Sequence, residues 1–224
     1  MSLLDRLRGR LIVSVQAEAD SPLNDPAAIA LLARCAGRSG AAAVRIEGVE
    51  RIRTVRATID LPIVGIVKRT HDGFAPYITS TPDEVDEVVA AGADVVAFDA
   101  TLRPHPHGAD CRTLVSRVHQ HGRLAMADCA DANDARAAAA AGADLVATTL
   151  AGYTDATRGR PLPALDLVTQ IAAMHPFAIC EGGIGDPQAA SAAFAAGAQT
   201  IVVGTAITNV DARVRLFVAA TPNA

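Results

Sequence analysis

The sequence alternates eight short apolar runs with alanine-rich segments of helical length, and this alternation limits the fold more than any other feature. The runs are apolar throughout, which is typical of parallel strands covered on both faces. They are Leu11–Val15, Ala42–Val44, Ile63–Val67, Val95–Phe98, Leu124–Ala127, Leu145–Ala147, Phe177–Cys180 and Thr200–Val203. Helices are predicted at Pro26–Ala36, Val49–Thr58, Pro82–Ala91, Asp110–His121, Asp131–Ala141, Ala164–Ala173, Pro187–Ala196 and Val210–Ala219.

A repeated glycine marks the passage from helix to strand before every second run. It occurs in Ser39-Gly40-Ala41, Ala91-Gly92-Ala93, Ala141-Gly142-Ala143 and Ala196-Gly197-Ala198. Glycine at a helix end favours a left-handed cap, so the repeat reports architecture. Eight β/α units in 224 residues predict a single (β/α)₈ barrel domain spanning residues 1–224. An open doubly wound sheet is the alternative, although no glycine-rich dinucleotide turn follows the first run.

Composition restricts the partner to a small molecule. Half of the residues are hydrophobic, 3% are aromatic and the formal charge is −4, which suits an aliphatic core and gives no basic surface for nucleic acid or an anionic membrane. No run has the roughly 18 apolar residues of a membrane span, and Met1–Arg10 lacks the apolar stretch of a secretion signal. We expect a cytoplasmic protein, and its smooth alanine-rich helix shell suggests a homodimer.

Polar residues follow the apolar runs in a regular way. In a barrel, functional side chains gather at the carboxyl ends of the strands. The residues at these ends are Gln16, Arg45, Glu47, Lys68, Arg69, Asp99, Asp128, Thr148, Thr149, Glu181, Gly204 and Thr205. As a group they predict a site with a cationic and an anionic side. Purely structural alternatives remain, because Arg45 can pair with Asp99, and Asp128 can cap the helix that starts near Asp131.

Lys68 is the most informative of these residues. A partly desolvated ammonium near arginines has a lowered pKa and can transfer protons near neutrality. Lys68 can also donate to a substrate oxygen, pair with Glu181 or form a Schiff base. A metal held by Asp99, Asp128 and Glu181 is a further alternative, but no histidine ends a strand, and we predict a site without metal.

The segment Glu181-Gly182-Gly183-Ile184-Gly185-Asp186 connects a strand to a helix through three glycines. Glycines before a helix allow an anion to approach backbone N–H groups. A second strand ends in Gly204-Thr205, and two neighbouring turns of this kind can share one phosphate. The sequence therefore predicts a phosphate site at Gly182, Gly183, Gly204 and Thr205, although such turns also occur only to reverse the chain.

Nearly the whole chain resembles the N-acetylmannosamine-6-phosphate 2-epimerases of bacterial sialic-acid breakdown. The matching segments include Val44-Arg45-Ile46-Glu47-Gly48-Val49, Pro62-Ile63-Val64-Gly65-Ile66-Val67-Lys68-Arg69, Leu124-Ala125-Met126-Ala127-Asp128-Cys129, Thr148-Thr149-Leu150-Ala151-Gly152-Tyr153-Thr154 and Gly204-Thr205-Ala206-Ile207-Thr208. The resemblance implies an isomerase without cofactor that inverts C2 of an N-acetylated sugar 6-phosphate in amino-sugar catabolism. It also implies that Lys68 transfers the proton with Glu181 as its acidic partner, and that the sugar is held by Gln16, Arg45, Asp128, Thr149 and Tyr153.

Two departures remove positive charge beside the predicted phosphate site. The family usually has arginine where this chain has Gly183, and again where it has Asn209. We predict that Arg158 and Arg160, in the loop after Tyr153, replace these cations. A sugar-phosphate-binding barrel without catalysis and another phosphate-binding isomerase or aldolase are the alternative functions.

Overall fold

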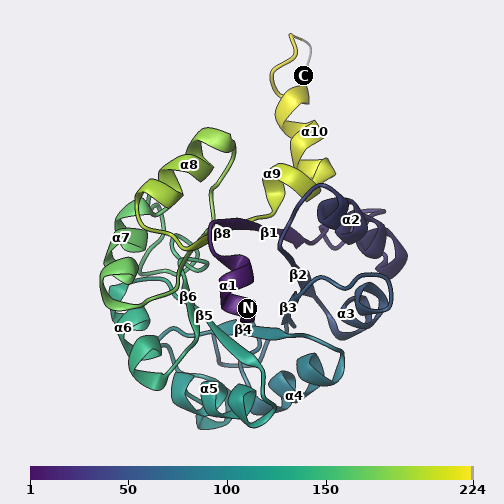
Figure 1. The fold of residues 1–224 in the computed structure, drawn as a ribbon. Coiled ribbons are helices and arrows are strands. Elements are labelled where there is room, and N and C mark those ends of the chain that lie inside the picture. The colour runs from purple at the N-terminus through teal and green to yellow at the C-terminus, as the bar shows by residue number, and fades with distance from the viewer. Residues whose placement is uncertain (223–224) are drawn as a thin grey trace.

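The computed structural model describes residues 1–222 and shows a closed barrel of eight parallel strands in the order β1 to β8 (Figure 1). The predicted (β/α)₈ barrel is therefore confirmed. The strands are β1 (Arg10–Val15), β2 (Ala43–Glu47), β3 (Ile63–Ile66), β4 (Val95–Asp99), β5 (Leu124–Asp128), β6 (Leu145–Ala147), β7 (Ala178–Glu181) and β8 (Thr200–Val203).

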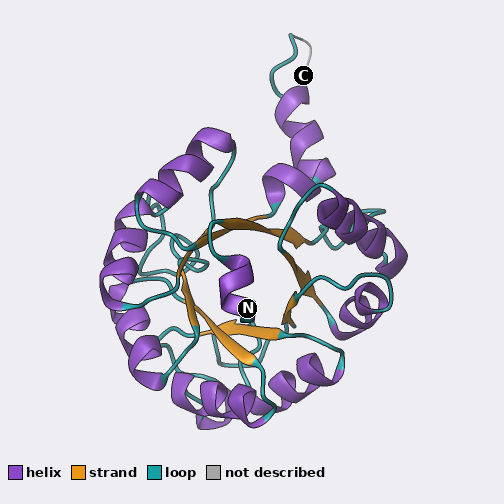
Figure 2. Ribbon diagram, viewed as in Figure 1, coloured by secondary structure: helices purple, strands orange, loops and turns teal. Residues whose placement is uncertain are grey.

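Helices surround the strands as an outer ring (Figure 2). Those of the ring are α2 (Pro26–Arg38), α3 (Val49–Arg56), α4 (Pro82–Ala90), α5 (Cys111–Gln120), α6 (Ala132–Ala141), α7 (Leu165–Met174) and α8 (Pro187–Ala195). The sequence did not predict three short elements, which are α1 (Leu3–Leu7), the 3₁₀ turn η1 (Pro106–Gly108) and α9 (Thr205–Thr208). Within residues 1–222, no helix combines the length and apolarity needed to cross a membrane.

Side chains alternate between the barrel interior and the helix layer along each strand, as the pleat requires. On β1, Ile12 belongs to the interior cluster, whereas Val13 belongs to the layer beneath the helices. Helix α1 lies over the centre of the ring in Figure 1, and its buried Leu7 packs on the interior cluster. Since α1 precedes β1, it covers the amino-terminal end of the barrel and leaves the carboxyl end open.

The four repeated glycines, which are Gly40, Gly92, Gly142 and Gly197, all have positive φ, between 89° and 106°. The prediction of left-handed helix ends is therefore confirmed. The starts of several helices also carry side-chain caps, for example Asp131 on α6 and Asp186 on α8.

The predicted strand ends differ from those in the structure in a way that matters for the site. Arg45, Asp99, Asp128 and Glu181 are residues of the strands themselves, not the first residues after them. The strands were predicted to end where the apolar runs end, but the backbone pairing between strands continues through these polar residues.

The last helix, α10 (Val210–Val218), also differs from expectation. The sequence predicts a helix here and not its direction, and this helix leaves the ring and points outward (Figure 1). None of its residues is buried, and Leu216 and Phe217 are about two-thirds exposed, at 60% and 67%.

Candidate active site

A cavity of about 590 Å³ opens at the carboxyl ends of the strands. It brings together most of the predicted site residues, and those that line it are Gln16, Arg45, Lys68, Thr149, Tyr153, Glu181, Gly182, Gly183, Gly204 and Thr205. The pleat explains why they meet. Arg45 and Glu181 each lie two residues beyond an inward-facing core residue, namely Ala43 on β2 and Ile179 on β7.

Arg45 is the central cation of this pocket. Its guanidinium is 1% exposed and forms a two-pronged contact with Asp128, with Nη1 3.0 Å from Oδ1 and Nη2 2.6 Å from Oδ2. Nη1 also donates to Glu181 Oε2 over 2.8 Å. One buried cation thus holds two carboxylates, and Asp128 supports the pocket from behind Arg45. The structural alternative of an Arg45–Asp99 pair is wrong, because the Arg45 guanidinium donates to Asp128 and Glu181 instead.

Thr149 completes this polar cluster. Its hydroxyl donates toward Asp128 Oδ1 over 2.6 Å and lies 3.1 Å from Glu181 Oε2. Thr148 fixes the end of β7 instead, since its hydroxyl accepts from the Glu181 N–H and donates to the Glu181 carbonyl. Neighbouring threonines therefore hold the side chain and the backbone of Glu181.

The electrostatics of the cluster favour a proton on Glu181. Burial raises the pKa of Glu181 to about 7, and the negative charge of Asp128 adds to this, while Arg45 opposes it. Burial by itself lowers the pKa of Arg45, but the negative charges of Asp128 and Glu181 raise it by more. The net shift is upward, so Arg45 stays charged. Glu181 can therefore hold or release a proton near neutral pH.

Lys68 enters the pocket just after β3, where Nζ donates to Gln16 Oε1 over 2.7 Å. The side chain is open to the pocket mouth, but the walls desolvate its ammonium and lower the pKa of Lys68, and the Arg45 charge lowers it further. Gln16 is oriented in turn, because its amide donates to Ser14 Oγ over 2.8 Å. A neutral lysine amine is thus more accessible here than on an ordinary surface.

Two tyrosines form part of the wall. Tyr153 was predicted and is 63% exposed at the rim. Tyr77 was not predicted, because it lies in the loop between β3 and α4 and follows no apolar run. Burial and the negative charges of Asp128 and Asp99 raise the pKa of Tyr77, so its phenol remains a hydrogen-bond donor.

The glycines lie at the other end of the pocket. Gly183 has φ +74°, and a Cβ there would lie 2.3 Å from the Leu162 Cβ. The loop that carries Leu162 therefore packs against residue 183, and no side chain, including the arginine usual in the family, fits on this backbone. Among the described residues, the N–H groups of Gly183, Gly204 and Thr205 donate to no backbone carbonyl, so they are available to an anion.

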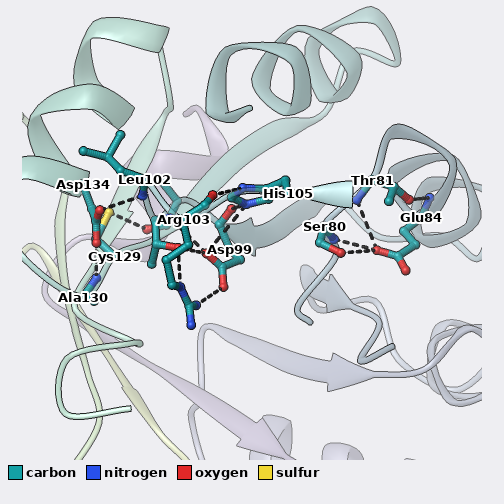
Figure 3. Close-up of polar contacts among 12 residues, drawn as sticks. Ser80, Thr81, Glu84, Asp99, Leu102, Arg103, His105, Cys129, Ala130 and Asp134 are labelled. Atoms are coloured by element: carbon teal, nitrogen blue, oxygen red, sulfur yellow. Dashed lines mark hydrogen bonds and ion pairs between the residues drawn. The ribbon is translucent and has the colours of Figure 1, made fainter. Parts of the chain in front are cut away.

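Asp99 lies outside this site and has its own partners (Figure 3). Arg103 Nη2 donates to its Oδ2 over 2.6 Å, the Thr101 hydroxyl donates to its Oδ1 over 2.6 Å, and His105 contacts its carbonyl. The alternative of a metal between Asp99, Asp128 and Glu181 is not supported, since no group of three or more potential ligands gathers within residues 1–222. Asp131, not Asp128, caps α6.

The structure does not bring Arg158 and Arg160 to the pocket. Arg158 pairs with Asp155 over 2.5 Å where both side chains are exposed, and Arg160 pairs with Asp166 over 2.5 Å. Neither lines the cavity, whereas Asn209, Arg213 and Glu18 do. The family resemblance pointed to the position of Asn209, but it did not indicate Glu18 or Arg213, and the direction of α10 that places Arg213 here was not predicted.

Comparisons with known proteins indicate the family of the chain. Residues 29–223 match a family model described as "Putative N-acetylmannosamine-6-phosphate epimerase". A relative from Synechococcus elongatus, described as "Putative N-acetylmannosamine-6-phosphate 2-epimerase", is 48% identical over 97% of this chain and 95% of its own length. An Enterobacter relative with the same description is 39% identical over 98% and 95%.

A solved structure is also very similar. The N-acetylmannosamine-6-phosphate 2-epimerase from Clostridium perfringens superposes with a TM-score of 0.95 at 36% identity, over 99% of this chain and 97% of that one. A thiamine phosphate pyrophosphorylase from Pyrococcus furiosus, with a TM-score of 0.64, 18% identity and coverage of 95% and 93%, shares the fold alone. The chain belongs to the N-acetylmannosamine-6-phosphate epimerase family.

Proposed function

We propose that this protein is a cofactor-independent epimerase that interconverts N-acetylmannosamine 6-phosphate and N-acetylglucosamine 6-phosphate by proton transfer at C2. One observation supports this proposal independently of family membership. A lysine with a lowered pKa and a glutamate with a raised pKa line the same pocket, together with Arg45. Opposed pKa shifts of this kind are typical of acid and base pairs.

The reaction begins from the open-chain aldehyde, in which the C2 proton lies next to a carbonyl. The neutral amine of Lys68 takes this proton, and the C–H electrons form an enolate with the charge on the carbonyl oxygen. The resulting Lys68 ammonium and the Arg45 guanidinium stabilise that charge. Glu181, protonated at the start, returns a proton to the opposite face of C2, and proton exchange with water restores both residues.

The remaining predicted residues take binding roles in this proposal. Gln16, Thr149 and Tyr153 face the sugar, while Asp128 acts through Arg45, which it orients. The phosphate binds at the free N–H groups of the two glycine turns, Gly182-Gly183 and Gly204-Thr205. These turns directly follow β7 and β8, which are paired neighbours in the barrel, so one phosphate can contact both turns.

Incubation of the protein with N-acetylmannosamine 6-phosphate in heavy water tests the proposal. Proton NMR should show N-acetylglucosamine 6-phosphate appearing with deuterium at C2. Stabilisation by the sugar phosphate without deuterium uptake, even at high enzyme concentration, would favour a binding protein. Irreversible labelling of Lys68 by borohydride in the presence of the sugar phosphate would favour an aldolase-type Schiff base.

We also propose a homodimer in the cytoplasm, as expected from the sequence. The support for self-association is the apolar surface of α10, which exposes Val214, Leu216, Phe217 and Val218. Exposed apolar surface of this kind is characteristic of contact regions, and a second copy of the chain is the most frequent partner. Light scattering should give twice the mass of one chain, and Phe217→Asp should reduce the measured mass to that of a single chain.

A further inference from the structure

Three cationic side chains line the pocket among the described residues, and they differ in what they contact. Arg45 is held by Asp128 and Glu181, and Lys68 bonds to Gln16. The Arg213 side chain has no hydrogen bond or ion pair within residues 1–222, and its guanidinium lies near the Phe217 ring, 5.7 Å from the centroid. Arg213 is therefore the pocket cation that still lacks an anionic partner.

Arg213 follows the predicted phosphate turn in the chain and lines the same pocket as Gly204 and Thr205. After Gly204 and Thr205, the short helix α9 leads directly to Asn209, whose side chain caps α10 by accepting from the Ala212 N–H over 2.8 Å. Arg213 follows one turn later, with its N–H bonded to the Asn209 carbonyl. The cap thus fixes the direction in which the helix carries Arg213 over the pocket.

The nearby carboxylate does not compete for Arg213. Glu18 also lines the pocket, but Arg215 and the Asn209 amide both donate to its Oε1, and the Arg215 contact is the main reason that the pKa of Glu18 is lowered. Two arginines of one helix are therefore used differently. Arg215 neutralises Glu18, while Arg213 gives this end of the pocket a net positive charge.

We propose that Arg213 binds the phosphate of the substrate, together with the N–H groups of Gly204 and Thr205. The inference rests on the proposed epimerase function and supplies the cation that Gly183 and Asn209 cannot provide. A guanidinium matches two phosphate oxygens, and a charge-assisted contact of this kind is stronger than a neutral one. Arg213 then sets the preference for phosphorylated over unphosphorylated sugar.

Steady-state kinetics on wild type, Arg213→Gln and Arg213→Lys test the assignment. For N-acetylmannosamine 6-phosphate, Arg213→Gln should lower kcat/KM about 10- to 100-fold, mainly through KM, and Arg213→Lys should restore part of the loss. Arg136→Gln is the control, because Arg136 is an exposed arginine of α6 that donates to Asn133 and does not line the pocket, and its loss should change kcat/KM less than about threefold.

A second measurement separates failure of this inference from failure of the proposed function. Calorimetric titration with glucosamine 6-phosphate and inorganic phosphate needs no turnover, and binding of both should weaken about 10-fold or more in Arg213→Gln. Equal binding and equal KM in wild type and Arg213→Gln would overturn the assignment, even if the wild type is an active epimerase. Loss of phosphate binding in Arg158→Ala/Arg160→Ala, with Arg213→Gln unaffected, would transfer the role to that loop.

Discussion

The Arg45 guanidinium donates to Glu181 Oε2 over 2.8 Å and joins β2 to β7 across the mouth of the barrel. The same guanidinium holds Asp128, so a single buried cation compensates two carboxylates. Because Glu181 shares Arg45 with Asp128, its charge is only partly compensated. This sharing, together with burial, leaves Glu181 able to gain and lose a proton near neutrality.

Replacing Arg45 should affect both stability and activity. Arg45→Met leaves Asp128 and Glu181 buried without their cation, which should cost about 3–5 kcal/mol of the free energy of unfolding. Denaturant titration measures this cost. Arg117→Met is the matched control, because Arg117 pairs with Asp86 at the exposed surface and its loss should matter far less. Similar losses in the two variants would contradict the central role of Arg45.

The raised pKa of Glu181 predicts a specific pH dependence of stability. Its ordinary pKa is 4.5, and the folded value is about 7. Between these values the folded chain keeps a proton that the unfolded chain has released, so the free energy of unfolding falls as the pH rises. Glu181 alone contributes a slope of up to ~1.4 kcal/mol per pH unit in that window.

Glu181→Gln removes this contribution. Denaturant titrations from about pH 5 to pH 7 should therefore show the variant gaining stability relative to wild type as the pH rises. Gln170→Ala, at an exposed position of α7, removes a side chain that does not titrate and should run parallel to wild type. A Glu181→Gln curve that also runs parallel would show that Glu181 has an ordinary pKa.

The two glycines on either side of Ile184 should respond differently to a methyl group. Gly183→Ala places a Cβ against Leu162 at positive φ and should cost about 1–3 kcal/mol. Gly185→Ala meets nothing within 4 Å and should change stability by less than about 0.5 kcal/mol. Thermal unfolding of both variants measures the difference. Equal unfolding temperatures would mean that the Leu162 loop does not pack on Gly183.

Sequence reasoning found the barrel and the pocket because both depend on local patterns. Eight apolar runs and the repeated glycines define the β/α units, and polar residues that end a strand on its inward face must meet at the barrel mouth. Arg45, Lys68 and Glu181 were recognised in this way.

The same reasoning failed where the outcome depends on which side chains or loops meet. Asp99 ends its strand as Asp128 does, but Arg103 follows four residues later and occupies it. The sequence predicts Arg158 and Arg160 as the pocket cations, but the presence of Arg213 in the pocket depends on the direction of α10, which no local pattern encodes. The contact of Leu162 with Gly183, which explains the glycine, joins two loops and was likewise invisible in the sequence.

Deuterium exchange at C2 in Lys68 variants tests the proposed mechanism at its first step. With N-acetylmannosamine 6-phosphate in heavy water, wild type should incorporate deuterium at C2. Lys68→Ala, and Lys68→Arg with its charge kept, should lower the exchange rate by at least about 100-fold. Arg69→Gln is the control, because Arg69 pairs with Glu87 away from the pocket and should stay within a few-fold of wild type. Exchange at the wild-type rate in Lys68→Ala would contradict the assignment of Lys68 as the base.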